Sequence, residues 1–414
     1  MSKGMKILFP IGSYYPSQQG GPCNSVRALA KGLLKTGHEV KVITTNYDIS
    51  PDAGIPFDQW TEVEGIQVFY MRFPTVSSPA KIDARILFRP GRLLSILGST
   101  SCDIVHPTML FTVLSHRAAE YAINKNLPVI WSPRGSMLPY TFSRGTLKKK
   151  LFLSLPFVKR GLTGSHFHAT SDEEAQQIAE VMRNYTGEDV TDRVHNIPNL
   201  VGDEVFTPGG EAAPYPYKYI LHLGRVHPKK KIENLIEAFS KMSPLKPHPN
   251  PLQSGEGENG GELKLVIAGW TCEVPEYTKS LKLLVERLRL NDRVIFTEKR
   301  VEGHDKATLY RHAEVFVLPS ESENFGMVVL ESLAQGVPVI ASNKTPWEIL
   351  EKRDAGYWPA NDPATLARAL ERFFSLNNDE RKKMAVNSVA LAQEYGNEAL
   401  IGKYLKMYEE VVRK

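Results

Sequence analysis

Two glutamates near the C-terminal end of the chain have a spacing and a setting that suit hydrogen bonding to hydroxyl groups. Glu323 lies in a polar turn after a short apolar run at 315–318, and Glu331 interrupts the apolar helical pattern of 325–335. A continuous helix would place residues eight positions apart about 12 Å from each other. This is about the span from a sugar, across a diphosphate, to a ribose. A carboxylate at each end can accept hydrogen bonds from vicinal hydroxyls.

The residues between the two glutamates are suited to binding an anion. Asn324, Phe325, Gly326 and Met327 form the predicted N-terminus of the helix. Free backbone N–H groups at a helix N-terminus attract phosphate, and a glycine allows a ligand to approach the backbone closely. A buried strand predicted on either side makes this a strand–loop–helix–strand unit of a parallel sheet. Its polar loop lies at the carboxyl end of a strand, where ligands bind in open α/β sheets.

Two isolated glutamates also fit a purely structural interpretation, in which Glu323 interacts with the helix dipole and Glu331 lies on a solvated face. The residues around the two glutamates favour a functional role. The run SESENFGMVVLESLAQGVPVIAS, residues 320–342, closely resembles the signature of the group 1 retaining glycosyltransferases. The resemblance includes the spacing of the glutamates, the Phe-Gly pair and the Gly-Val-Pro-Val-Ile segment. It implies the α/β fold called GT-B, with two Rossmann-like doubly wound domains facing across a cleft.

The length and composition agree with a two-domain globular protein. A chain of 414 residues exceeds one ordinary domain. With the resemblance, we expect an N-terminal acceptor-side domain at 1–200 and a C-terminal nucleotide-sugar donor-side domain at 201–392. A C-terminal helix at 393–414 is expected to cross back to the first domain. The net charge of +5 is modest and no basic tract is interleaved with aromatics, so nucleic acid is not an expected partner.

Cysteine usage and hydropathy predict a cytoplasmic protein. Three cysteines lie far apart in the sequence, which fits a reducing compartment better than a disulfide framework or a metal site. No signal peptide is recognised before the first predicted strand, and no apolar stretch has the length that a bilayer requires.

A glycine pair near the N-terminus is a second candidate phosphate site. Gly20 and Gly21 separate a predicted strand at 5–12 from a helical pattern at 26–34. Backbone N–H groups of such a loop can face a phosphate, although a lone glycine pair by itself favours a flexible loop. The spacing is not that of the dinucleotide fingerprint, which argues against an oxidoreductase. In the family that the chain resembles, this loop borders the donor diphosphate.

Arg134 occupies a position that the resemblance marks as functional. The segment beginning SPRGSM resembles the family segment that places a histidine or an arginine near the donor phosphate and the acceptor. Whether Arg134 is catalytic or only binds phosphate is left open. Farther along, Ser171 followed by three acids reads as an ordinary helix start with no functional role.

A basic stretch could contact a membrane. No acidic residue occurs from 121 to 171, and basic residues at 148–150 and 159–160 flank the apolar run 151–158. This combination can lie on an anionic membrane surface, on the inner face of the membrane. A core-facing helix with a solvated basic end is the equal alternative.

The second domain opens with a strand that ends at a glycine and an arginine. Arg225 and Lys230 follow the strand, and an arginine fork with a nearby lysine suits a diphosphate. In the resembling family, the matching residues hold the donor diphosphate. The loop at Val301 resembles the one that cups the nucleotide base. A stretch rich in Pro, Gly and Asn at 243–261 is expected to be a surface insertion.

No metal or cofactor is expected. The sequence contains neither a D-x-D motif nor a His/Cys/carboxylate set with metal spacing, so Arg225, Lys230 and helix N–H groups would meet the charge of the leaving diphosphate. The resemblance implies retention at the anomeric carbon. It assigns Glu323 to the sugar hydroxyls, with front-face attack assisted by the leaving phosphate oxygen. Nucleophilic catalysis by Glu323 is the alternative. The expected catalytic set is Glu323, Arg225, Lys230 and Arg134.

The resulting hypothesis is a hexosyltransferase of polysaccharide or glycoconjugate biosynthesis. UDP-glucose or a similar UDP-sugar is the expected donor, and a saccharide or a lipid-linked intermediate is the expected acceptor. A nucleotide-sugar epimerase of the same fold, a dehydrogenase and a non-catalytic carbohydrate-binding protein are the alternatives. The sequence names neither the sugar nor the acceptor.

Overall fold

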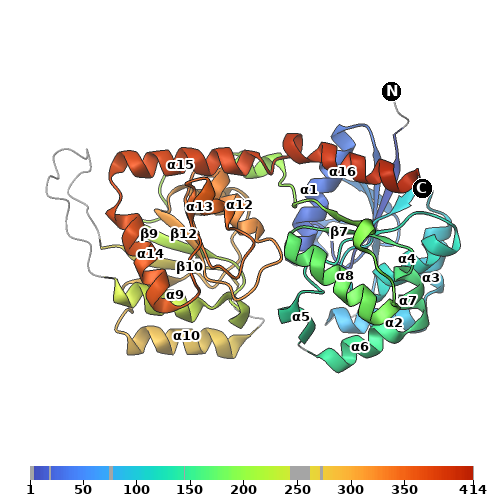
Figure 1. The fold of residues 1–414 in the computed structure, drawn as a ribbon, viewed down its shortest axis with the longest axis horizontal. Helices are drawn as coiled ribbons and strands as arrows, with labels where there is room; N and C mark the ends of the chain where they lie inside the picture. The colour runs from blue at the N-terminus through green and yellow to red at the C-terminus, as the bar shows by residue number, and fades with distance from the viewer. Residues whose placement is uncertain are drawn as a thin grey trace. The chain divides into compact units, whose positions relative to one another are not determined.

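The computed structural model describes residues 4–17, 20–73, 78–143, 145–242, 262–270 and 274–413. The chain forms two compact units, one of Met1–Gly202 with Gly396–Lys414 and one of Asp203–Tyr395 (Figure 1). The sequence placed the first boundary at 200/201 and the start of the returning helix at 393. The insertion expected at 243–261 lies outside the described residues.

The first unit contains two sets of mainly parallel strands. The larger sheet has the order β3-β4-β2-β1-β5, in which β3 runs antiparallel to β4. The smaller has the order β6-β7-β8, and a bridge from Val105 to Val129 joins it to the end of the larger sheet. The strands are β1 (Lys6–Pro10), β2 (Glu39–Thr45), β3 (Trp60–Val63), β4 (Ile66–Met71), β5 (Ile104–Val105), β6 (Ile130–Trp131), β7 (His166–Ala169) and β8 (Val194–Asn196).

The strand order creates a switch point between β1 and β5. From β1 the chain proceeds to β2 and β4 on one side, and from β5 it proceeds to β6, β7 and β8 on the other. Loops at the carboxyl ends of the two central strands diverge there and leave a place for a ligand. The helices of this unit are α1 (Gly21–Lys35), α2 (Pro79–Phe88), α3 (Gly91–Gly98), α4 (Val113–Asn124), α5 (Pro139–Ser143), α6 (Thr146–Ser154), α7 (Pro156–Leu162), α8 (Asp172–Thr186) and α16 (Asn397–Val412).

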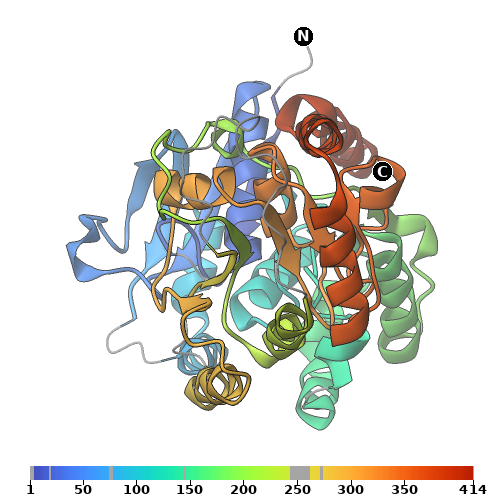
Figure 2. The same cartoon turned by 90° about the vertical axis from the view of Figure 1, so that its left-hand side faces the viewer.

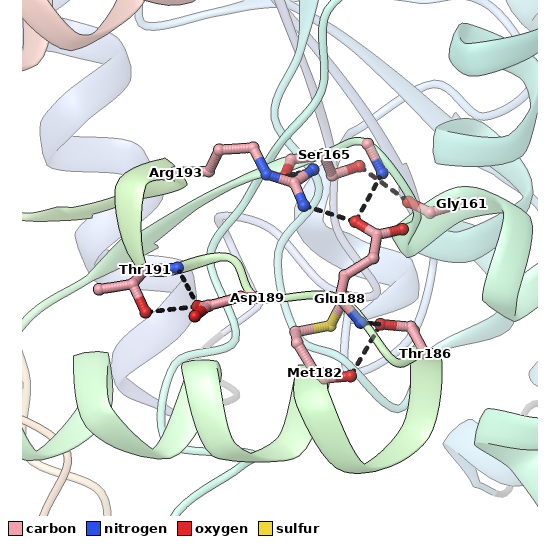
Figure 3. A network of polar contacts seen from close by, with 9 residues as sticks. Gly161, Ser165, Met182, Thr186, Glu188, Asp189, Thr191 and Arg193 are labelled. Atoms are coloured by element: carbon pink, nitrogen blue, oxygen red, sulfur yellow. Dashed lines mark hydrogen bonds and ion pairs between the residues drawn. The ribbon is translucent and has the colours of Figure 1, made fainter.

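A polar network closes the connection from α8 to β8 (Figure 3). Arg193 donates to the carboxylate of Glu188 and, at 3.2 Å, to the carbonyl oxygen of Ser165. Asp189 accepts from the backbone N–H of Thr191 at 3.0 Å and from its hydroxyl at 2.6 Å. These contacts fix the C-terminal end of α8 relative to β7.

The second unit has a fully parallel six-stranded sheet of order β11-β10-β9-β12-β13-β14. Its strands are β9 (Tyr219–Leu223), β10 (Lys264–Ala268), β11 (Val294–Phe296), β12 (Val315–Leu318), β13 (Val339–Ala341) and β14 (Gly356–Tyr357). From β9 the chain proceeds outward to β10 and β11, and from β12 it proceeds outward on the other side. The switch point of this unit is therefore between β9 and β12.

Helices cover this second sheet and supply its core. They are α9 (Ile232–Lys241), α10 (Pro275–Arg287), α11 (Gly303–Arg311), α12 (Met327–Ala334), α13 (Ile349–Lys352), α14 (Pro363–Ser375) and α15 (Asn378–Gln393). On α9, Ile232, Leu235, Ile236 and Phe239 recur at helical spacing and are fully buried, each contributing about 1.5–3 kcal/mol. α14 lies beside α9 in both views (Figures 1 and 2).

The C-terminal helix α16 packs against α1 within the first unit (Figure 1). A Cβ atom at Gly32 of α1 would lie 2.2 Å from Asn397 Oδ1 and 3.1 Å from Ile401 Cδ1. The absence of a side chain at Gly32 is what allows the two helices to approach.

We expect Gly32→Val to lower the free energy of unfolding by about 1–3 kcal/mol, because the added methyl groups must displace α16. Gly402→Val on α16 is the matched control, since a Cβ atom there meets nothing within 4 Å. Urea unfolding of the two variants measures the difference. Equal stabilities would contradict this packing of α16.

Candidate active site

An ion pair between Lys230 and Glu323 lies at the switch point of the second unit. Lys230 ends a short 3-10 turn that follows β9, and Glu323 lies in the loop that follows β12. The lysine ammonium donates to Glu323 Oε1, and both side chains are mostly buried, with 14% and 13% of their surface exposed. The two loops are also joined through the backbone, because the Glu321 N–H donates to the Lys229 carbonyl oxygen at 2.8 Å.

The charge state of Glu323 follows from its neighbours. Burial favours the protonated acid, but the charges of Lys230 and Lys229 and a 2.8 Å hydrogen bond from Ser320 hold the pKa of Glu323 below its ordinary value of 4.5. Because the pKa of Glu323 is lower in the folded than in the unfolded protein, the ion pair stabilises the fold at pH values above the ordinary pKa of 4.5. This stabilisation is lost as the pH falls through the lowered pKa of the folded state. Glu323 is therefore ionised at neutral pH.

Glu331 is held by two side chains of α11. It lies on α12 and is 7% exposed. Lys306 donates to its Oε1 at 2.8 Å and the Tyr310 hydroxyl donates to its Oε2 at 3.3 Å. The solvated-face interpretation of Glu331 is thus wrong, because a buried carboxylate needs such partners.

The path from Glu323 to Glu331 is not one continuous helix. α12 begins at Met327, four residues after Glu323, so the length calculated for a helix throughout does not apply. Gly326 caps the helix with a φ of 85°, a conformation that favours glycine. A Cβ atom there would also lie 3.2 Å from Trp347 Nε1.

Trp347 anchors the turn that contains Asn324 and Phe325. Its indole N–H donates to the carbonyl oxygen of Phe325. The rings of Phe325, Trp347 and Tyr395 pack together with centroids 5.4–5.8 Å apart. This aromatic cluster fixes the backbone N–H groups at the start of α12. The sequence around Trp347 gave no indication of the cluster.

The remaining predicted residues of the second unit lie in neighbouring loops. Arg225 follows β9 and is exposed, and Val301 is half-buried two residues before α11 begins. The helix after Val301 is therefore the one that supplies Lys306 and Tyr310 to Glu331. These two residues were not predicted from the sequence, although their four-residue spacing places them on one helix face.

In the first unit, the glycine pair lies at the switch point. Gly20 has a φ of 79° and caps α1, whose first residue is Gly21. The loop that leads to them follows β1, the central strand. Arg134 follows β6, which lies beyond β5 from β1.

Arg134 and Gly135 form an unusual turn, with φ values of 54° and 75°. The Arg134 guanidinium donates to Asn199 Oδ1. The Gly135 N–H donates to Glu174 Oε1 at 2.6 Å. Ser171 caps α8 as predicted, accepting from the Glu174 N–H at 3.2 Å. The predicted N-cap with acids in the first turn is confirmed, and the carboxylate of Glu174 is in addition fully buried, which the sequence did not indicate.

A chain of buried polar groups lies beside this turn. His106 contacts the Tyr408 hydroxyl at 2.7 Å and the Ser132 hydroxyl at 2.6 Å, and Ser132 contacts His168 at 2.7 Å. Burial is the main cause that holds the pKa values of both histidines well below their usual range, with the Arg134 charge acting in the same direction. Both rings are therefore neutral. The hydrogen-bonded side chains connect α16 to the ends of β5, β6 and β7.

The described residues contain neither a metal site nor a membrane-spanning helix. Within those ranges, no group of three or more His, Cys, Asp or Glu side chains is arranged to hold a metal ion. No helix in the same part of the chain combines the length and the apolar character needed to cross a membrane.

The fold is that of the GT-B class of glycosyltransferases. A solved structure of HepE from Anabaena, in complex with UDP and glucose, superposes with a TM-score of 0.70 at 16% identity, covering 98% of this chain and 100% of that one. Sucrose-phosphate synthase from Thermosynechococcus elongatus gives a TM-score of 0.72 at 18% identity, covering 98% of each chain. These likenesses establish the fold, and the predicted fold class is confirmed.

Two family models match the two units in turn. Residues 19–204 match the family described as Glycosyltransferase Family 4, and residues 208–389 match Glycosyl transferases group 1. The chain belongs to the group 1 glycosyltransferases, as its motifs indicated.

Relatives with curated names cover different shares of the chain. An uncharacterized glycosyltransferase of Methanocaldococcus jannaschii is 26% identical over 90% of this chain and 89% of its own length. The D-inositol 3-phosphate glycosyltransferase of Xylanimonas cellulosilytica is 25% identical over 59% of this chain, which spans 57% of that relative.

Replacing Lys230 with alanine should lower the turnover of a nucleotide-sugar donor at least about tenfold, because a charge-assisted contact is worth about 1.5–3 kcal/mol. Replacing Arg225 should have a similar effect. Lys282→Ala is the control, since it breaks the exposed pair with Glu298 on the same unit. Nucleotide release measures turnover. Wild-type kinetics in both Arg225 and Lys230 variants would refute the diphosphate assignment.

Proposed function

We propose that the protein is a retaining hexosyltransferase that uses a nucleoside diphosphate sugar, UDP-glucose or a similar UDP-sugar. The acceptor is a saccharide or a lipid-linked intermediate in polysaccharide or glycoconjugate biosynthesis. The observation that carries the proposal is the pair of buried glutamates after β12, each bound to a lysine of another element: Glu323 to Lys230 and Glu331 to Lys306. Such carboxylates, fixed in place beside cations, suit a ligand that is both hydroxylated and anionic.

In the proposed complex, the donor lies along α12. Glu331 accepts from the ribose hydroxyls, and the backbone N–H groups at Gly326 and Met327 face the diphosphate. Lys230 and Arg225 neutralise the leaving diphosphate without a required metal. Glu323 accepts from the hydroxyls of the transferred sugar. Lys230 and Ser320 both engage Oε1 of Glu323, so Oε2 is the oxygen that these two contacts do not occupy.

Glu323 serves here as a sugar-positioning group. Its ion pair and lowered pKa keep it ionised, so that both of its oxygens act as hydrogen-bond acceptors. A nucleophilic role would leave a glycosyl group on Glu323 as an intermediate, which mass spectrometry of the protein during turnover can detect. Arg134 is assigned to the transfer step, and the loop at Gly20 and Gly21 to a phosphate of the donor.

Similar proteins support the choice of substrate class. HepE was solved with UDP and glucose, and named relatives act as a D-inositol 3-phosphate glycosyltransferase or as an N-acetyl-alpha-D-glucosaminyl L-malate synthase. The acceptors in these names are small polar molecules, so the acceptor screen should include polyols and hydroxy acids besides saccharides and lipid-linked sugars.

The test is a thermal-shift screen of nucleotide sugars, followed by NMR of the products with and without EDTA. The proposal requires a new glycoside with the anomeric configuration of the donor, formed equally in EDTA. Conversion of the donor alone into another sugar would indicate an epimerase. Binding without any turnover across the acceptor panel would indicate a carbohydrate-binding protein.

Contact with an anionic membrane surface is also proposed, for α6. This helix exposes 81% of Leu147 and 67% of Leu151, and its Lys148 and Lys150 are exposed as well. By contrast, α7 buries Phe157 and Val158, so the core-facing interpretation holds for α7.

Flotation with vesicles containing anionic lipid should recover the protein, and Leu147→Ser with Leu151→Ser should reduce recovery several-fold. Both substitutions remove apolar area that membrane binding would bury, and each Å² of that area contributes about 25 cal/mol to binding. Val386→Ser, which alters an exposed apolar residue of α15, is the control. Equal recovery of all variants would contradict the assignment of α6.

The two glutamates should have separable effects. Glu331→Gln should weaken free UDP and the UDP-sugar by similar factors, because the ribose contact is common to both. Glu323→Gln should spare free UDP yet depress turnover, because sugar contacts position the anomeric carbon. Calorimetry gives the affinities and nucleotide release gives turnover. If Glu323→Gln weakens free UDP as much as Glu331→Gln does, the donor does not lie along α12 in this direction.

A further inference from the structure

The turn that carries Arg134 is held in a conformation that its own sequence does not favour. Both Arg134 and Gly135 have positive φ values, and this region is sterically unfavourable for a residue other than glycine. Such a turn persists only where surrounding contacts impose it. The structure supplies two of these contacts, Asn199 at the guanidinium and Glu174 at the backbone.

Glu174 is built into the fold as an acceptor for backbone groups. Its Oε1 accepts from the Gly135 N–H at 2.6 Å. Its Oε2 accepts from the Thr170 N–H at 2.9 Å and from the Thr170 hydroxyl at 2.8 Å. The side chain has no solvent exposure. It therefore ties the loop after β6 to the end of β7.

The helix that presents Glu174 is fixed at both ends. Its N-terminus is capped by Ser171. Its C-terminal connection is closed by the network of Glu188 and Arg193 (Figure 3). A carboxylate on such a rigid element can hold a partner within the small tolerance that a functional group requires.

Glu174 and Arg134 also belong to one electrostatic environment. Burial raises the pKa of Tyr404, while the charges of Arg134 and Glu174 act on it in opposite directions. The neighbouring histidines, His106 and His168, are neutral. Arg134 and Glu174 thus both lie close enough to the buried Tyr404 for their charges to act on the same group.

We propose that Glu174 is a positioning residue for the transfer step, which imposes the Arg134–Gly135 turn and so directs the Arg134 guanidinium. The inference rests on the proposed role of Arg134 in transfer. It gives a function to an acid that an N-cap pattern alone would leave unexplained, because a capping role needs no buried carboxylate.

Glu174→Gln separates this role from general stability. A glutamine amide has one acceptor oxygen, and turning that oxygen toward the two donors of Thr170 keeps two hydrogen bonds. The NH2 group then faces the Gly135 N–H, donor against donor, and the turn is released. Thr170→Val is the converse control, since it removes one contact of Glu174 and leaves the contact to Gly135. Glu173→Gln, at an exposed position of the same helix, controls for the change of charge.

We expect kcat to fall about tenfold or more in Glu174→Gln, with the affinity for free UDP unchanged. Thr170→Val and Glu173→Gln should keep kcat within about threefold of wild type. The decisive readout is a double-mutant cycle with Arg134→Ala. If Glu174 acts through Arg134, Glu174→Gln has little further effect on kcat once Arg134 is gone.

Each outcome of these experiments either supports the positioning role of Glu174 or overturns it. Full additivity of the two substitutions, or equal losses of kcat in Thr170→Val and Glu174→Gln, would overturn the positioning role while leaving Arg134 in place. Wild-type kcat in Arg134→Ala would overturn the assignment of Arg134, and this inference with it. If Glu174→Gln does not fold, as judged by thermal unfolding, Asn199→Ala removes the other anchor of Arg134 and takes its place in the cycle.

Discussion

The second unit is organised around the ion pair of Glu323 and Lys230, in which a buried carboxylate requires a cation. Removing two charges from water is costly, and removing either partner leaves an uncompensated charge inside the protein. The parallel sheet meets this requirement through its topology, because β9 and β12 are neighbours whose following loops diverge. A lysine after one strand and a glutamate after the other thus meet at the point where a ligand can enter. A diphosphate at this point would compete for the lysine, which links ligand binding to the pair itself.

The same physical pattern recurs at two other places. Glu331 is buried on α12 and receives Lys306 and Tyr310 from α11. Glu174 is buried on α8 and receives the backbone of the Arg134 turn. In each case a helix or loop at the carboxyl end of the sheet contributes the acid, and a neighbouring element contributes the donor. Rigid strands and helices fix the acids, while the loops that they hold carry the groups assigned to chemistry.

Local patterns and the family resemblance were enough to predict the fold class and the strand, loop and helix that carry Glu323 and Glu331. The apolar run at 315–318 is β12, and Gly336 adopts the left-handed conformation expected after a helix, with a φ of 75°. What the sequence could not supply were partners distant in the chain. Lys306 precedes Glu331 by 25 residues and Tyr408 follows His106 by 302, so only the folded sheet brings them together. The burial of Glu174 was not predicted because an acid in the first turn of a helix normally lies in solvent, and only tertiary packing decides which way it turns.

The central claim is that the second unit binds a nucleoside diphosphate along α12 with its own side chains. A crystal structure of the protein with UDP tests this most directly. We expect ribose hydroxyls within hydrogen-bond distance of Glu331 and phosphate oxygens at Lys230, Arg225 and the N-terminus of α12. Phosphates at Glu331, or a nucleotide bound away from the switch point between β9 and β12, would contradict this mode of binding.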